Sequence, residues 1–166
     1  DGDEDVKILS NFAKTPFVLD GIKYNTVEGF WQSLKTEYPI MRDKIALLTD
    51  GFDAKQIGRK LATNSQLFTY QDKLYRVGSQ QHHILLERAV RAKTFQNLIP
   101  VVSALKASGN RPLRHMLKNQ HGSWRAGDSP ALPAIVFEQM WTRIRQELNE
   151  GTFTPILPLP DGINDF

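Results

Sequence analysis

The stretch YNTVEGFWQSLK, from Tyr24 to Lys35, predicts the start of a helix with an unusual face. Residues four and seven positions apart on a helix point in nearly the same direction, so Glu28, Gln32 and Lys35 should share one stripe. Trp31 borders that stripe. A stripe that only packed against a core would be filled with aliphatic side chains. The mixture of a carboxylate, an amide and an amine therefore needs another explanation.

One explanation is structural. If Asn25 caps the helix, Glu28 is its third residue, and the carboxylate can reach back to the backbone of the cap in a capping box. The functional explanation places the same carboxylate in a pocket, where it can activate water. Lys35 would then stabilise negative charge or act as a nucleophile. The residues by themselves leave both explanations open.

Working outward from this helix, the rest of the chain predicts more helices and a few short strands. Two strands are expected in segments 7–12 and 17–25, with a turn at Asp20-Gly21. Asp53 should cap one helix, and Gly51 should end the helix before it. The fold class expected is α+β, a mostly helical single domain with a few short strands. Apolar spacing and Gly or Pro boundaries predict helices over 41–51, 53–62, 79–97, 100–110 and 132–151.

The length of 166 residues is sufficient for one domain with its own core. We expect this domain to cover residues 1–150. A Pro-rich, extended tail should follow over residues 151–166, because the prolines are incompatible with a regular helix. The chain contains no cysteine, which excludes disulfides, thiolate metal sites and a cysteine nucleophile.

The charge and hydropathy patterns bear on compartment and partners. No apolar run is long enough to cross a bilayer, and the first residues, DGDED, are acidic rather than signal-like. We therefore expect a cytoplasmic protein with no membrane partner. The net charge of +3 is too small to indicate nucleic-acid binding, but residues 111–125, RPLRHMLKNQHGSWR, are basic and contain no acid. They form either a solvated basic face or a surface for phosphate, with Trp124 as a stacking platform.

No cofactor is expected. The histidines lack a recognised metal-ligand motif, and the adjacent His82 and His83 point to different sides of a helix. No glycine-rich loop of the Walker or dinucleotide type is present. We therefore predict chemistry without a metal ion.

A longer motif, LSNFAKTPFVLDGIKYNTVEGFWQSLK (residues 9–35), resembles the N-terminal signature of the NADAR family, the YbiA-like N-glycosidases. Three later segments resemble other parts of that family: IGRKLA (57–62), ERAVRAKTFQN (87–97) and SWRAGD (123–128). The resemblance implies a YbiA-like fold and hydrolysis of the bond between a ribose and a base or amine. The implied substrates are small ribosyl phosphates related to ADP-ribose, ADP-ribosylated guanine in DNA, or phosphorylated riboflavin-pathway intermediates.

The resemblance also implies roles for individual residues. Cleavage of a ribosyl C–N bond develops positive charge on the sugar, and Glu28 is the candidate to stabilise it or to deprotonate water. Lys35 is its catalytic partner, which either grips a sugar oxygen or phosphate or attacks the anomeric carbon to form an imine. The expected binding residues are Gln32 and Asn11 for ribose hydroxyls, Arg59 and Lys93 for phosphate, Phe12, Trp31 and Trp124 for stacking, and Ser10, Gly58 and Asp128 from the same motifs.

Some of these residues have structural alternatives, and the chain departs from the family pattern. Asn11 can form a turn with its own backbone, and Trp31 can belong to the core. Gly29 stands where many members carry His, while His121 and Arg125 replace an Asp and a Gly. His121 and Asp128 are candidates for the missing acid. These changes motivate a second hypothesis, a module that binds ADP-ribose or modified nucleic acid without cleaving it.

Overall fold

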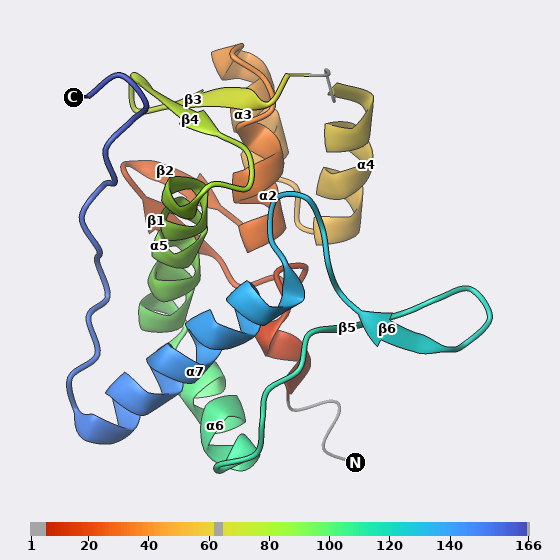
Figure 1. Ribbon diagram of the computed structural model, residues 1–166, viewed down its shortest axis with the longest axis vertical. Coiled ribbons are helices and arrows are strands. Elements are labelled where there is room, and N and C mark those ends of the chain that lie inside the picture. The colour runs from red at the N-terminus through yellow and green to blue at the C-terminus, as the bar shows by residue number, and fades with distance from the viewer. Residues whose placement is uncertain (1–5, 62–64, 166) are drawn as a thin grey trace.

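A computed structural model describes residues 6–61 and 65–165 of the chain (Figure 1). Within these residues the strands pair only as three antiparallel hairpins, β1–β2, β3–β4 and β5–β6, and helices form most of the body. The expected α+β class is therefore confirmed. The elements are η1 (Lys7–Leu9), β1 (Phe17–Leu19), β2 (Ile22–Tyr24), α2 (Val27–Ser33), α3 (Pro39–Ala46), α4 (Gly51–Leu61), β3 (Leu67–Tyr70), β4 (Lys73–Arg76), α5 (Gln80–Gln96), α6 (Leu98–Ser108), β5 (Met116–Lys118), β6 (Trp124–Ala126) and α7 (Ala134–Glu150).

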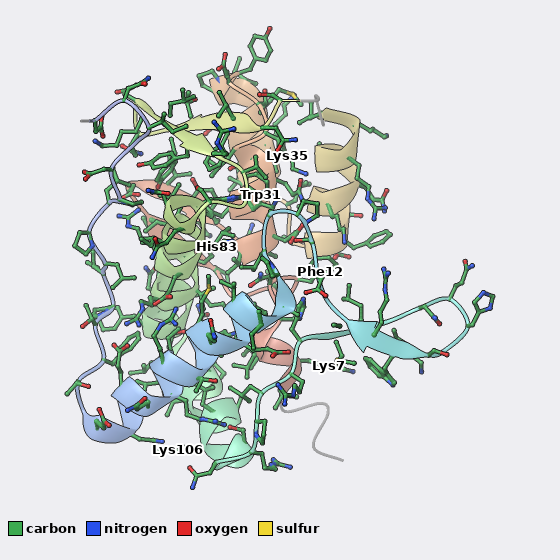
Figure 2. All side chains as sticks on the ribbon, in the orientation of Figure 1. Lys7, Phe12, Trp31, Lys35, His83 and Lys106 are labelled. Carbon is green, nitrogen blue, oxygen red and sulfur yellow. The ribbon has the colours of Figure 1, made fainter. Side chains whose placement is uncertain are left out.

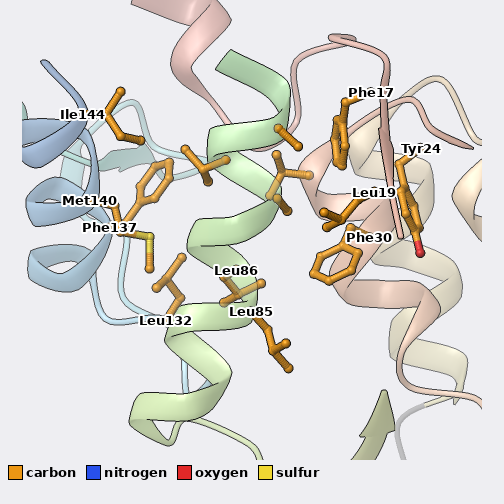
Figure 3. Packing of buried hydrophobic residues seen from close by; sticks show 14 of the residues in the cluster. Phe17, Leu19, Tyr24, Phe30, Leu85, Leu86, Leu132, Phe137, Met140 and Ile144 are labelled. Atoms are coloured by element: carbon orange, nitrogen blue, oxygen red, sulfur yellow. The ribbon is translucent and has the colours of Figure 1, made fainter. Parts of the chain in front are cut away.

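Helix α5 is the centre of the hydrophobic core. Ser79 caps its N-terminus by accepting a hydrogen bond from the His82 backbone N–H at 3.1 Å. Leu85 and Leu86 on α5 are buried between α7 on one side and α2 with the β1–β2 hairpin on the other (Figure 3). Phe137 and Met140 of α7 fill the first side, and Phe17, Tyr24 and Phe30 fill the second. The core therefore holds α2 against the central helix.

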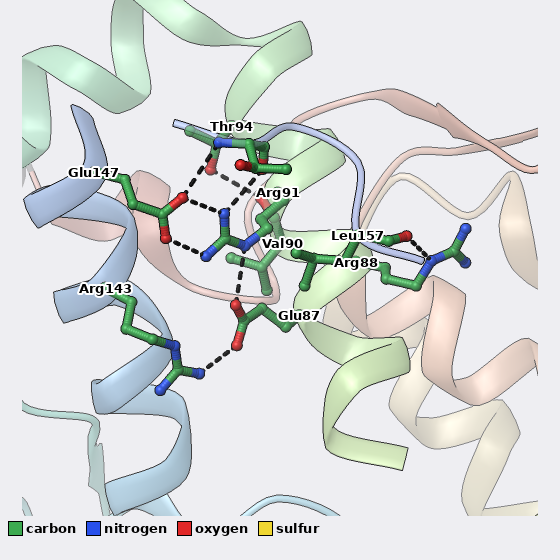
Figure 4. A network of polar contacts seen from close by, with 9 residues as sticks. Glu87, Arg88, Val90, Arg91, Thr94, Arg143, Glu147 and Leu157 are labelled. Atoms are coloured by element: carbon green, nitrogen blue, oxygen red, sulfur yellow. Dashed lines mark hydrogen bonds and ion pairs between the residues drawn. The ribbon is translucent and has the colours of Figure 1, made fainter. Parts of the chain in front are cut away.

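Buried ion pairs join α5 to α7. The Arg91 guanidinium is 3% exposed and donates to Glu87 on its own helix and to both carboxylate oxygens of Glu147 on α7, at 2.6–2.9 Å (Figure 4). Arg143 of α7 also pairs with Glu87. Arg91 and Glu87 lie away from water, so each needs an opposite charge beside it when the two helices pack, whereas Glu147 and Arg143 remain partly exposed.

The residues after α7 run extended along the body to the β3–β4 hairpin (Figure 1). The carbonyl of Leu157 accepts a hydrogen bond from Arg88 Nε at 3.0 Å, and the carbonyl of Pro160 accepts one from the Tyr75 hydroxyl at 2.7 Å. The Ile163 N–H donates to the Leu74 carbonyl at 2.8 Å. Buried polar groups of the body thus hold this segment in place.

Three local predictions are wrong. Segment 7–12 contains a 3-10 turn rather than a strand, because the Ser10 hydroxyl accepts the Phe12 N–H and competes with ladder pairing. Segment 17–25 forms both strands of a hairpin instead of one strand. Gly51 begins α4 rather than ending α3, and the Asp50 carboxylate accepts the Phe52 N–H at that end in place of Asp53.

Candidate active site

A cavity of about 1090 Å³ lies between α2, α4, β3 and the segment that precedes α7. Its volume slightly exceeds the range of ~300–1,000 Å³ that is usual for small-molecule sites, so a nucleotide-sized ligand has room in it. Figure 2 labels Phe12, Trp31 and Lys35 of its wall. The cavity brings together nine residues that the sequence pointed to: Ser10, Asn11, Phe12, Glu28, Trp31, Gln32, Lys35, Arg59 and Asp128.

The Glu28 carboxylate faces this cavity and is not used to cap its helix. Thr26, not Asn25, is the N-cap, and its hydroxyl accepts the Gly29 N–H at 2.8 Å. The backbone N–H of Glu28 donates to the Asn11 carbonyl at 2.9 Å. The carboxylate accepts a hydrogen bond from Gln32 Nε2 at 2.6 Å, one turn further along α2. The capping-box explanation is therefore wrong, because the cap lies one residue later than expected.

Gly58 makes room for the Gln32 side chain. A Cβ atom at position 58 would lie 1.7 Å from Gln32 Oε1 and 2.5 Å from its Cδ, so only glycine permits this contact between α2 and α4. Gln32 is 3% exposed, and its Oε1 is buried without a hydrogen-bond partner among the described residues. Gly58 does not line the cavity itself. It positions the amide that in turn holds Glu28.

Burial shifts the proton affinities of the two catalytic candidates in opposite directions. Loss of solvent raises the pKa of Glu28, against the opposing effects of the Gln32 hydrogen bond and the cations Lys55, Lys35 and Arg59. Loss of solvent also lowers the pKa of Lys35, while the Glu28 charge acts to raise it. The Lys35 ammonium lies 5.4 Å from the centroid of the Trp31 ring. A partly desolvated acid on α2 and a partly desolvated amine just after the end of α2 therefore line the same cavity.

Lys93 does not line the cavity, contrary to its expected role as a phosphate ligand. It points into the interior from α5, is fully buried, and donates through Nζ to the Ser10 carbonyl at 2.8 Å. Burial lowers its pKa to about 7. Because Asn11 in turn accepts the Glu28 N–H, Lys93 anchors the loop that supports the start of α2.

The three aromatic candidates differ in position. The Phe12 ring lines the cavity, with the Lys55 ammonium 5.6 Å from its centroid. Trp31 lines it too, and also packs on Phe68 and on His82 at centroid distances of 5.4 and 4.3 Å, so it belongs to both core and site. Trp124 is 62% exposed on β6 and does not line the cavity. The expected stacking role of Trp124 on a ligand inside this cavity therefore has no geometric support.

The departures from the family pattern lie outside the cavity or at its edge. Gly29 is buried, and a Cβ there would approach the Thr26 hydroxyl at 3.0 Å, so this position faces its own cap. His121 is exposed in the turn between β5 and β6. Asp128 does line the cavity, but one carboxylate oxygen accepts the Ala134 N–H at 2.8 Å and caps α7. Of the two acid candidates, only Asp128 reaches the site.

Lys55 and His115 also line the cavity, although neither is among the site residues expected from the sequence. Lys55 precedes Arg59 by one helical turn on α4, a spacing that places both on one face and could have revealed it. His115 is held by its backbone N–H, which donates to Glu138 at 2.8 Å, and by edge contact with the Phe137 ring. Burial lowers the pKa of His115. No local sequence pattern predicts that His115 is a site residue, because only the tertiary packing brings this part of the chain to the cavity.

Neither a metal site nor a membrane-spanning helix is found in the part of the chain that the structure describes. No group of three His, Asp or Glu side chains there is arranged to hold a metal ion. In the same part of the chain, every helix is too short or too polar to cross a membrane.

The chain is similar to known proteins in sequence and in structure. Residues 6–124 match the family model described as bacteriophage protein GP30.3. An uncharacterized 17.1 kDa protein from the Gp30–rIII intergenic region of Enterobacteria phage T4 is 44% identical over 54 residues, which cover 32% of this chain and 35% of that protein. The chain thus matches about a third of the length of that relative. The NMR structure of the E. coli protein YbiA superposes with a TM-score of 0.64 at 20% identity, covering 91% of this chain and 83% of that chain. The expected YbiA-like fold is confirmed.

Proposed function

The chain belongs to the bacteriophage GP30.3 family of YbiA-like NADAR proteins, and from this premise we propose that it is an N-glycosidase. The proposed reaction hydrolyses the bond between the ribose C1′ and a base or amine nitrogen in an ADP-ribose-related substrate, including ADP-ribosylated guanine. The observation that carries the proposal is the Glu28 carboxylate, which is held by Gln32 at 2.6 Å inside a cavity that also contains Lys35.

Glu28 supplies the chemistry that a ribosyl bond requires. As the C–N bond breaks, positive charge develops on the ribose ring, and an ionised carboxylate near C1′ stabilises that charge. The same carboxylate accepts a proton from the attacking water, whose oxygen forms the new bond to C1′ while the base leaves with the bonding electrons. Its hydrogen bond to Gln32 fixes the carboxylate orientation before substrate arrives.

Lys35 has two roles open to it, and both use its place in the cavity wall just after the end of α2. As an ammonium it grips a sugar oxygen or a phosphate. As a free amine it attacks the anomeric carbon and displaces the base, which leaves with the electrons of its C–N bond. The ribose ring oxygen then leaves C1′ and takes up the proton lost from the lysine nitrogen, which gives an imine that water later hydrolyses. The lowered pKa of Lys35 increases the fraction of free amine and so favours the second route. Reduction with borohydride during turnover distinguishes them, because only the imine route leaves a covalent adduct.

The part of the wall that α4 forms is suited to a phosphate. Lys55 and Arg59 project from α4 into the cavity, and a guanidinium binds a phosphate through two parallel hydrogen bonds. Phe12 and Trp31 offer apolar ring surface to a base or sugar. These groups support a negatively charged nucleotide as substrate.

The decisive experiment is an assay of wild type and Glu28→Gln on three substrates: an ADP-ribosylated oligonucleotide, NAD+ and a phosphorylated ribosylamine intermediate of riboflavin synthesis. We expect release of the base or amine from at least one of them by the wild type, and a loss of about 100-fold or more in Glu28→Gln. Glu150→Gln is the matched control, because Glu150 is exposed at the end of α7.

The same assay tests the alternatives. Cleavage of the riboflavin intermediate alone would identify a metabolite-processing enzyme. Calorimetric binding of ADP-ribose without turnover of any of the three would replace the enzymatic proposal with the binding module. A Glu28→Gln variant that remains folded and fully active would refute the assignment of that carboxylate.

A further inference from the structure

We propose that the β5–β6 hairpin is a binding arm for single-stranded nucleic acid. The hairpin projects from the body (Figure 1). All residues of β6 and the two end residues of β5 are exposed, while Leu117 between them is half-buried and lines the cavity. The face that carries Lys118 and Trp124 is therefore uncovered. An isolated two-stranded hairpin is marginally stable in water. A ribbon that extends from the fold with this face uncovered points to a partner.

The hairpin is nevertheless well ordered by its own turn. The Asn119 side chain accepts the backbone N–H groups of His121 and Ser123, each at 2.9 Å. The Asn119 N–H donates to the Ser123 carbonyl at 2.8 Å. These bonds preorganise the tip, so binding does not have to supply the cost of ordering it.

The side chains of the ribbon suit a nucleic-acid strand. Trp124 is 62% exposed and stands opposite Lys118, whose ammonium lies 5.7 Å from the centroid of the indole ring. An exposed aromatic ring stacks on any base, and a neighbouring cation pairs with the adjacent phosphate. Arg125 adds a second exposed cation on the other face, opposite Leu117. The run 111–125 contains no acid that would repel a polyanion.

The hairpin also continues into the cavity wall. Leu117 of β5 lines the cavity, and so do His115 just before β5 and Gly127 and Asp128 just after β6. A strand bound to the ribbon is therefore adjacent to the cavity that Lys55 also lines. Delivery of a nucleotide of that strand to Glu28 rests on the proposed function, whereas strand binding by the hairpin does not.

A single strand fits this arrangement better than a duplex or a protein. The stacking face with Trp124 and the face with Arg125 are opposite sides of a ribbon whose strands lie ~4.8 Å apart, and a flexible strand can wrap both. A stacked duplex hides its base faces from Trp124. A protein partner at an exposed aromatic would need acidic residues to match the two cations, whereas every nucleic acid already carries that charge.

The test measures fluorescence anisotropy of a short labelled oligothymidylate, and of its RNA counterpart, with the full chain at low salt. We expect wild type to bind, and Trp124→Ala to weaken binding about 5- to 100-fold, as loss of one stacked base does. Trp124→Phe should recover most of the loss. For Lys118→Gln with Arg125→Gln, the slope of log affinity against log salt should fall by about 1.4, since each lost phosphate contact contributes about 0.7.

Lys106→Gln with Lys23→Gln is the control, since both residues are exposed on other elements and the loss of charge is identical. Equal weakening in the control and hairpin variants would overturn the proposal, as would absence of binding by the wild type. Equal affinity of Trp124→Ala and wild type for the oligonucleotide would also overturn it. Tighter binding of a duplex of the same length would overturn the single-strand assignment.

The outcome is independent of catalysis. If oligonucleotide binding depends on Trp124 but no substrate is hydrolysed, the proposed binding arm is supported and the proposed N-glycosidase activity is refuted. Hydrolysis of a small nucleotide by a chain that binds no oligonucleotide would do the reverse. If both proposals hold, Trp124→Ala lowers kcat/KM on the modified oligonucleotide and leaves it within about twofold on the small nucleotide.

Discussion

Substitution of Gly58 by alanine tests the contact on which the site geometry depends. The three atoms closest to a Cβ at this position all belong to the Gln32 side chain, and the nearest lies at 1.7 Å. Heavy atoms without a bond between them cannot approach so closely, so Gln32 must leave its place. Its 2.6 Å hydrogen bond to Glu28 then breaks. The variant therefore acts on the catalytic candidate through Gln32, and the substituted residue itself does not line the cavity.

The size of the effect follows from two opposing contributions to the free energy of unfolding. Alanine in a helix interior is favoured over glycine by about 1 kcal/mol. Loss of a hydrogen bond to a charged group costs about 1.5–3 kcal/mol. In the wild-type background Gly58→Ala should therefore destabilise the protein by about 0.5–2 kcal/mol. In a Gln32→Ala background the obstruction is gone, and the same change should stabilise it by about 1 kcal/mol.

Urea unfolding of the four proteins in this double-mutant cycle measures the coupling. The expected coupling energy between positions 32 and 58 is about 1.5–3 kcal/mol, the difference between the two backgrounds. Hydrolysis by Gly58→Ala should fall about 100-fold, because a displacement of about 1 Å in a reacting group has that effect. Equal destabilisation by Gly58→Ala in both backgrounds would refute the reasoning, since it would mean that the methyl group meets something other than Gln32.

Three further predictions concern buried charges. Glu28→Gln should raise stability at pH 8 and have little effect near pH 4, because the raised pKa of Glu28 in the folded state makes wild-type stability fall as the pH rises through that pKa. Thermal unfolding of both proteins at the two pH values measures this difference. Wild-type stability should increase by roughly 2 kcal/mol between pH 7 and 9 through Lys93, whose folded pKa of about 7 lies below its unfolded value, and Lys93→Met should abolish that part of the increase in urea titrations. Arg91→Met should cost about 3 kcal/mol in the same titrations, because Glu87 and Glu147 lose a buried partner; a cost below about 1 kcal/mol would contradict the compensation inferred from Figure 4.

The stripe on α2 illustrates how far local pattern reaches. Helical periodicity placed Glu28, Gln32 and Lys35 on one face, and the structure puts all three in the cavity wall. Periodicity shows which side chains point in the same direction. It could not show whether they contact the helix cap, the core or a ligand, because those contacts are made with other parts of the fold. Because the cap is Thr26, one residue after the expected Asn25, the Glu28 carboxylate is not used in a capping box.

Lys93 and Trp124 show the opposite limit. Both belong to motifs that resemble the family, yet Lys93 is fully buried against the Ser10 carbonyl and Trp124 lies on an exposed ribbon outside the cavity. A motif specifies neighbours along the chain, whereas access to a ligand depends on which face of a helix the rest of the fold covers. His115 entered the wall for the same reason, without any local signal.

The order of residues was sufficient to determine the class of the fold, most helix positions and the family, because periodicity, caps and contiguous motifs are local properties of the chain. The tertiary structure alone decided that the Glu28 carboxylate is buried beside Lys55 and Arg59, that Gly58 shapes the place of Gln32, and that the basic run forms an exposed arm. Those features depend on contacts between segments far apart in the chain, and burial sets the strength of every charge in them.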